Sequence, residues 1–188
     1  MPVGDAEAEL REQMCKLWQE TFGDEHDFVM HYLSRYSRED NRILRFDERG
    51  EVVAMMHYHP FTMGESCAET GASEVGVAKC PYDVEVRLVP TRERMEGCRG
   101  AYIYGVATAV ECRGRGIASA MLAESMAKMR SRGIDFAMLI AEEPSLRRWY
   151  GGMGFELLEG VTASVTAPDG TNLAMDDSEL NVPMILWL

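Results

Sequence analysis

The sequence predicts a mixed α/β fold with a mostly antiparallel sheet, one parallel βαβ unit and flanking helices. Three patterns predict it: helical spacing of apolar residues at the start of the chain, a strand-turn-strand pattern after it, and a strand, a helix and a second strand in succession near the middle. The 188 residues suffice for one domain with a sizeable core, since domains cluster near roughly 100 to 150 residues. We therefore expect a single domain over residues 1–188.

Two amphipathic helices are expected first. Apolar residues recur with helical spacing from Leu10 to Thr21 and again from Phe28 to Tyr36. We expect Gly23 to end the first helix and Asp24 to cap the second, because glycine favours the left-handed helix end and aspartate accepts from free N–H groups.

An antiparallel hairpin is expected from Arg42 to Pro60. Its strands are RILRFD and EVVAMMHYHP, and the turn between them is ERG. The pattern weakens over residues 64–100, where we expect an insertion or long loops and one strand, DVEVRLVP.

The middle of the chain predicts the βαβ unit. The segment GAYIYGVATAV is rich in β-branched and aromatic residues, a helix is expected from Ile117 to Arg132 with a stop at Gly133, and the strand DFAMLIAE follows. Strands joined by a helical crossover are expected to be parallel, with a right-handed connection.

A short helix and further strands are expected near the C-terminus. Pro144 and Ser145 open the helix, Gly154 closes it, and a strand begins at Phe155. Two more segments, VTASVTA and VPMILWL, have the composition of strands, and a PDG turn follows the first of them.

The charge is uneven along the chain. The formal net charge of −12 argues against nucleic acid as the main partner, because phosphate neutralisation needs a basic face. Between Arg87 and Arg148 there are eleven Lys/Arg and seven Asp/Glu, a local charge of +4. The remaining residues have eight Lys/Arg and 24 Asp/Glu, which is −16. A small basic region is therefore set in an acidic chain.

Several classes of protein are disfavoured. Apolar runs are far shorter than the ~20 residues that cross a bilayer, and the acidic start MPVGDAEAEL differs from a basic secretory signal. The five cysteines include no CxxC pair and are expected to be reduced thiols. His57 and His59 alternate on one strand without a third ligand nearby, which favours packing or substrate contacts over a metal. We expect a cytoplasmic protein that uses neither membrane nor metal.

The segment from Arg113 to Ser119 is the strongest candidate for a ligand site. It lies between a strand and a helix N-terminus, where N–H groups lack intrahelical partners and the helix dipole favours an anion. Glycines permit close approach of a phosphate, and two arginines add charge. A Walker-type loop is excluded, because GxxxxGK[ST] does not occur. A dinucleotide site stays open, with Glu142 or Glu143 as the ribose ligand, although about a hundred residues precede this single βαβ unit.

The run from Arg113 to Ala118 resembles R/Q-x-x-G-x-G/A, the acetyl-coenzyme A signature of the GNAT acetyltransferase superfamily. GVAT before it is similar to the family's fourth strand, and Tyr150 to Phe155 resembles the family's Y-x-x-x-G-F. The resemblance is strongest from Ala101 to Leu158, extends over Ala6 to Phe61, and is weakest over residues 64–100 and after Glu159. It implies the GNAT fold over the whole chain.

The resemblance also implies a site for acetyl-coenzyme A (acetyl-CoA), the acetyl donor. Val106, Ala107 and Thr108 would form the strand edge that binds the pantetheine arm, with the Val106 N–H as oxyanion donor. The pyrophosphate would be held by Arg113, Gly114, Arg115, Gly116, Ile117, Ala118 and Ser119. Tyr150 would be the general acid, although it could instead be a core residue. Gly151 and Gly152 replace the polar residues usual after this tyrosine, which puts its placement in question.

The acceptor and the general base stay open. The candidate bases are Glu85, Glu111, His57 and His59, or a water relay. The acidic remainder of the chain favours a small cationic primary amine as acceptor. The expected function is N-acetyl transfer to such an amine, and the alternatives are a non-catalytic acyl-CoA sensor and a dinucleotide-binding protein. The sequence is also compatible with a homodimer.

Overall fold

The computed structural model describes residues 3–63, 84–89, 93–174 and 181–188. The chain forms two compact units, one made of Met1–Tyr58 and Gly105–Ser125 and the other of His59–Tyr104 and Met126–Leu188. Three elements contribute residues to both units: β2 (Val52–Thr62), β4 (Arg99–Thr108) and α3 (Ile117–Ser131). The single domain over residues 1–188 stays a prediction. Among the described residues, no helix is both long and apolar enough to cross a membrane.

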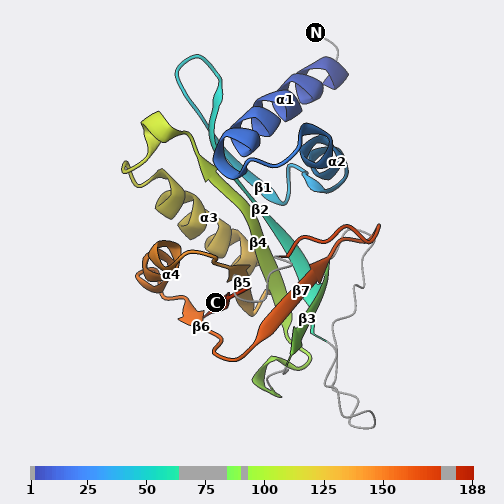
Figure 1. Ribbon diagram of the computed structural model, residues 1–188, viewed down its shortest axis with the longest axis vertical. Coiled ribbons are helices and arrows are strands. Elements are labelled where there is room, and N and C mark those ends of the chain that lie inside the picture. Colours follow the sequence, from blue (N-terminus) through green and yellow to red (C-terminus); the bar gives the residue numbers. More distant parts are fainter. Residues whose placement is uncertain (1–2, 64–83, 90–92, 175–180) are drawn as a thin grey trace. The chain divides into compact units, whose positions relative to one another are not determined.

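The first unit joins two helices to a hairpin. Its complete elements are α1 (Val3–Phe22), α2 (His26–Tyr36), β1 (Arg42–Phe46) and the 3₁₀ turn η2 (Val110–Cys112). Helices α1 and α2 pack against each other (Figure 1). Strands β1 and β2 pair antiparallel from Arg42 opposite His57 to Phe46 opposite Val52, which confirms the predicted hairpin.

The apolar faces predicted for the two helices are buried. The buried residues of these faces include Met14, Leu17, Trp18, Val29, Tyr32, Leu33 and Tyr36. Two ion pairs add to this packing: the Arg42 guanidinium donates to Glu7 Oε1 at 2.8 Å, and Arg45 Nη2 donates to Glu124 Oε2 at 2.6 Å. The second pair connects β1 to α3 within this unit.

The prediction that Asp24 caps α2 is wrong. Glu25 occupies the N-cap position and makes no side-chain capping hydrogen bond. The Asp24 carboxylate instead accepts a hydrogen bond from Trp18 Nε1 at 2.7 Å. Trp18 is only 1% exposed, and a buried indole N–H without a partner would cost more than the cap contributes. The aspartate therefore holds the tryptophan.

The second unit contains most of the sheet. Its complete elements are β3 (Glu85–Val89), η1 (Glu93–Met95), β5 (Phe136–Ile140), α4 (Pro144–Gly151), β6 (Glu156–Leu157), β7 (Thr162–Thr166) and β8 (Pro183–Trp187). Strand order here is β2, β4, β5, β8, β6. Strands β4 and β5 are parallel, with Gly100–Tyr102 opposite Phe136–Met138, which confirms the predicted parallel unit. Strand β8 pairs antiparallel with both β5 and β6.

Strands β3 and β7 form a separate antiparallel pair. Glu85 lies opposite Thr166 and Val89 opposite Thr162, so the strand predicted at DVEVRLVP pairs with a segment far along the chain. Val86, Leu88, Ala163 and Val165 bury one face of the pair. The insertion or long loops were predicted over residues 64–100, and residues 64–83 and 90–92 of that range lie outside the described residues, as does the acidic stretch 175–180.

Aromatic rings pack tightly around Gly100 in the second unit. Phe61 and Phe136 meet edge to face with centroids 5.6 Å apart, and the Phe136 and Trp187 centroids are 5.3 Å apart. A Cβ atom on Gly100 would overlap the Phe61 ring and lie 2.7 Å from Phe136 Cζ. Glycine is required there because the two rings occupy the space of a side chain.

We predict that Gly100→Ala lowers the free energy of unfolding by about 1–3 kcal/mol, because overpacking displaces the rings. Gly151→Ala is the matched control, since its Cβ would meet nothing within 4 Å and its φ is not positive. We expect that control to be neutral or to stabilise by about 0.5–1 kcal/mol. Urea unfolding of both variants measures the difference, and equal effects would contradict this packing.

Candidate functional site

The backbone between β4 and α3 turns sharply over a few residues of the first unit. The Cys112 N–H donates to the Ala109 carbonyl at 2.9 Å and the Arg113 N–H to the Val110 carbonyl at 3.3 Å. Gly114 and Gly116 then adopt φ angles of +73° and +75°, the left-handed region that favours glycine. Helix α3 begins directly afterwards, at Ile117.

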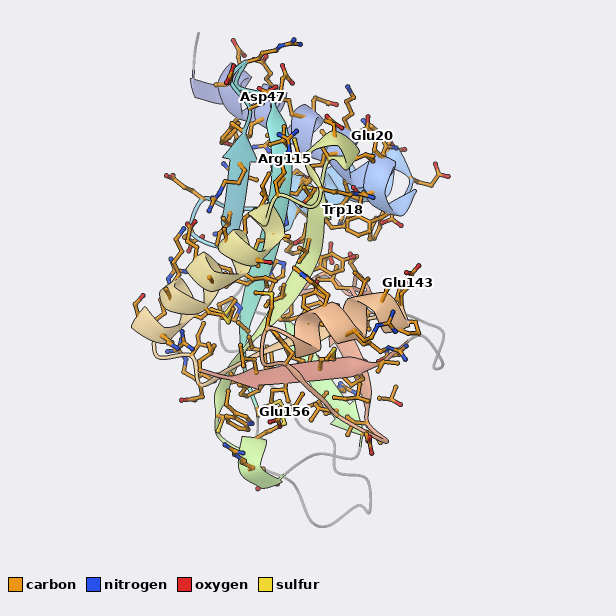
Figure 2. The ribbon with its side chains drawn as sticks, turned by 90° about the vertical axis from the view of Figure 1, so that its left-hand side faces the viewer. Trp18, Glu20, Asp47, Arg115, Glu143 and Glu156 are labelled. Carbon is orange, nitrogen blue, oxygen red and sulfur yellow. The ribbon has the colours of Figure 1, made fainter. Side chains whose placement is uncertain are left out.

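This turn leaves an open, electropositive surface. A Cβ placed on Gly114 or Gly116 would meet no atom within 4 Å, and the Arg113 and Arg115 side chains are exposed (Figure 2 labels Arg115). The amide groups of the first turn of α3 have no intrahelical partners, and the positive end of the helix dipole lies there. The predicted segment from Arg113 to Ser119 therefore spans this turn and the first residues of α3, and its role in binding pyrophosphate stays a prediction.

Arg113 makes a contact that the sequence did not predict. Its Nε donates to the carbonyl oxygen of Thr108 at 2.9 Å. The side chain thus returns to the last residue of β4, five positions earlier in the sequence. Arg115 has no hydrogen-bond or ion-pair partner among the described residues.

The predicted pantetheine edge lies at the end of β4. Ala107 is buried, and Val106 and Thr108 are half-buried. The parallel register with β5 covers Gly100–Tyr102, whereas β4 continues to Thr108. The end of β4 therefore extends past its recorded pairing with β5.

Gly105 is a functional candidate that sequence reasoning missed. It has a φ of +62° inside β4, which is typical of a bulge, and its Cβ would lie 2.6 Å from Trp18 Cζ3. Both the backbone conformation and the close approach of the indole require glycine. The backbone conformation of Gly105 sets the direction of the following peptide, whose N–H belongs to Val106. An isolated glycine within a strand pattern was the available signal.

Tyr150 lies in the second unit, on α4. It is 7% exposed, with ring centroids 4.7 Å from Trp149 and 5.6 Å from Phe155. Burial raises the pKa of the Tyr150 phenol to about 12, because the charged phenolate is poorly solvated there. Gly151 ends the helix, so the tyrosine itself is in regular helix despite the two glycines after it. The phenol stays protonated at physiological pH.

The candidate bases have different surroundings. His57 is buried, with its Nε2 2.8 Å from Ser37 Oγ. His59 is buried too, and desolvation lowers its pKa to about 4, which makes it a weak base. Glu85 is ion-paired with Arg87 at 2.6 Å, and Glu111 is exposed in η2. Within the described part of the chain, no three His, Cys, Asp or Glu side chains form a group that could hold a metal.

Comparisons with known proteins bear on this geometry. A family model described as acetyltransferase (GNAT) domain matches residues 91–158. A solved structure of histone acetyltransferase HPA2 and related acetyltransferase from Corynebacterium glutamicum is 16% identical, with a TM-score of 0.57 over 95% of this chain and 90% of that chain. A GNAT family N-acetyltransferase (YhbS) from Escherichia coli, in complex with CoA, is 14% identical, with a TM-score of 0.54 over 94% and 75%.

A GCN5-related N-acetyltransferase from Kribbella flavida is 16% identical, with a TM-score of 0.54 over 80% of this chain. The chain spans only 32% of the length of that protein. No curated protein matches the sequence. The solved structures share the fold, so the fold implied by the resemblance is confirmed.

We predict that Gly116→Val abolishes the rise in melting temperature that acetyl-CoA produces, because a β-branched residue is strained at φ +75°. Gly170→Val is the control, since Gly170 has a φ of +88°, also meets nothing within 4 Å, and lies in the turn after β7. The Gly170→Val variant should be destabilised to a similar degree, but acetyl-CoA should still raise its melting temperature in differential scanning fluorimetry. A shift with NADH instead would favour the dinucleotide alternative.

Proposed function

We propose that this chain is an acetyltransferase of the GNAT superfamily, whose family model matches residues 91–158. In this proposal it transfers the acetyl group of acetyl-CoA to a primary amine of a small cationic acceptor. The observation that carries the proposal is the turn before α3, where Gly114 and Gly116 are left-handed and open to solvent. This turn offers backbone N–H groups and Arg115 to a pyrophosphate.

The end of β4 would orient the thioester. Backbone groups of Val106, Ala107 and Thr108 would bind the pantetheine amides in the manner of an added strand. The Val106 N–H follows the left-handed Gly105, and in this proposal it donates to the oxyanion when the amine attacks the acetyl carbonyl. A fixed donor at that atom stabilises the tetrahedral intermediate more than the ground state.

Tyr150 would supply the proton for the leaving group. The amine nitrogen forms a bond to the carbonyl carbon, the C–S bond then breaks, and the departing thiolate takes the phenolic proton of Tyr150. The nitrogen gives up its own proton to a base or to water, and solvent reprotonates the phenolate. A pKa of about 12 keeps Tyr150 in its donor form throughout the physiological range.

The charge distribution supports a cationic acceptor. The residues outside Arg87–Arg148 carry −16, and a negative field concentrates amines in their charged form near the protein. An acidic acceptor would be repelled by the same field. We also propose a cytoplasmic location, which suits the free thiols of Cys15, Cys98 and Cys112.

Thiol release from acetyl-CoA tests the transfer itself. An acetyltransferase is expected to release thiol slowly from acetyl-CoA by hydrolysis, and faster when an acceptor amine is added. Acetyl-CoA binding with no thiol release in the presence of any amine tested would instead support the non-catalytic sensor.

We predict that Tyr150→Phe lowers kcat by ~10²-fold or more while acetyl-CoA binding changes little, because only the phenolic proton is lost. The sign of the pKa shift adds a second expectation. A raised pKa leaves the donor form complete below about pH 11, so the ratio of wild-type to variant kcat should be constant from about pH 6 to 9. Activity near wild type would mean that water protonates the thiolate and that Tyr150 is a packing residue.

We predict that an acceptor panel at ~50 mM salt shows a preference for polyamines, aminoglycosides or lysine-like amines over acidic amines. The preference should weaken at ~300 mM salt, because the Debye length falls from about 14 Å to 6 Å. Thiol release measures kcat/KM for each acceptor. Preference for an acidic acceptor, or a cation preference indifferent to salt, would refute the electrostatic argument and leave acetyl transfer standing.

A further inference from the structure

The contact of Arg113 with β4 uses one particular atom. The donor is Nε, the secondary nitrogen nearest the aliphatic part of the side chain, at 2.9 Å from the Thr108 carbonyl oxygen. The two terminal nitrogens of the guanidinium have no hydrogen-bond partner among the described residues. Arg113 is exposed, and this hydrogen bond connects its side chain to β4.

The two residues joined by this bond belong to different parts of the proposed donor site. Thr108 is the last residue of β4, the strand edge that would bind pantetheine, and Arg113 begins the segment that would hold the pyrophosphate. The four residues between them form the η2 turn and its flanks, which backbone hydrogen bonds at Cys112 and Arg113 also stabilise. The hydrogen bond from Arg113 Nε to Thr108 therefore restrains the distance between the end of β4 and the segment that would hold the pyrophosphate.

We propose that Arg113 is a positioning residue for acetyl-CoA that acts through the hydrogen-bond donor at its ε position rather than through its charge. This inference rests on the proposed function. It separates the two arginines of the turn: Arg113 fixes the distance between the two binding segments, and Arg115 supplies side-chain charge to the phosphates. A fixed distance between the two segments strengthens the binding of a coenzyme that contacts both, because less conformational entropy is lost when the coenzyme binds.

Substitutions of Arg113 can separate the effect of its hydrogen-bond donor from the effect of its charge. In glutamine, Nε2 stands the same number of bonds from Cβ as Nε does in arginine, so glutamine offers a donor at the same place without charge. Methionine has a similar length and neither donor nor charge.

The experiment measures CoA affinity by isothermal titration calorimetry for wild type, R113Q and R113M. R113Q should bind within about threefold of wild type, whereas R113M should bind ~10-fold more weakly, the loss expected for one hydrogen bond. R115Q and R115M are the matched controls, and both should weaken binding equally, because both remove the charge. Steady-state kinetics should show R113M as a rise in KM for acetyl-CoA with kcat at saturation nearly unchanged.

Two further readouts exclude a general structural effect. The unliganded melting temperatures of R113Q and R113M should agree, because the side chain is exposed. The salt dependence of CoA affinity should be shallower for R115Q than for R113Q. Equal weakening by R113Q and R113M would overturn the proposal and make Arg113 a charged phosphate ligand. Absence of CoA binding by wild type would overturn the proposed function and this inference together.

Discussion

The left-handed backbone at Gly114 and Gly116 is the constraint on which the proposed donor site depends. Both glycines lie directly before α3 at positive φ angles, which L residues with a Cβ resist. The same two glycines leave the approach to the helix N-terminus free of side chains. Glycine at these two positions therefore meets both the positive φ angles of the turn and the open space that the proposed phosphate site needs.

Local patterns of the sequence predicted most of the elements, because helical spacing, strand composition and turn glycines are properties of neighbouring residues. The hairpin from Arg42 and the parallel pairing of β4 with β5 followed from such patterns. The hydrogen bond between Trp18 and Asp24 did not follow from a local pattern. An aspartate before a helix can cap that helix or accept a hydrogen bond from another side chain, and here the buried indole of Trp18 takes the carboxylate. The pairing of β3 with β7 was not predictable either, since strand composition does not name a partner.

The candidate site was predicted to a similar degree. The glycine and arginine pattern located the turn before α3, whereas the Nε contact of Arg113 depends on how far the turn folds back on β4. The role of Gly105 depends on a tryptophan that lies far away in the sequence. Burial also gives titratable groups properties that their identity alone does not: it raises the pKa of Tyr150 and lowers that of His59, because both shifts favour the neutral form.

The pairing of β3 with β7 has a consequence for the order in which the second unit is built. Five residue pairs close a loop of more than seventy residues, and the entropy of that closure must be spent before the pair gains its hydrogen bonds. Contacts of such long sequence separation form slowly, whereas those of neighbouring segments form early. The β3 and β7 pair should therefore assemble after the parts of its unit that are close together in the sequence.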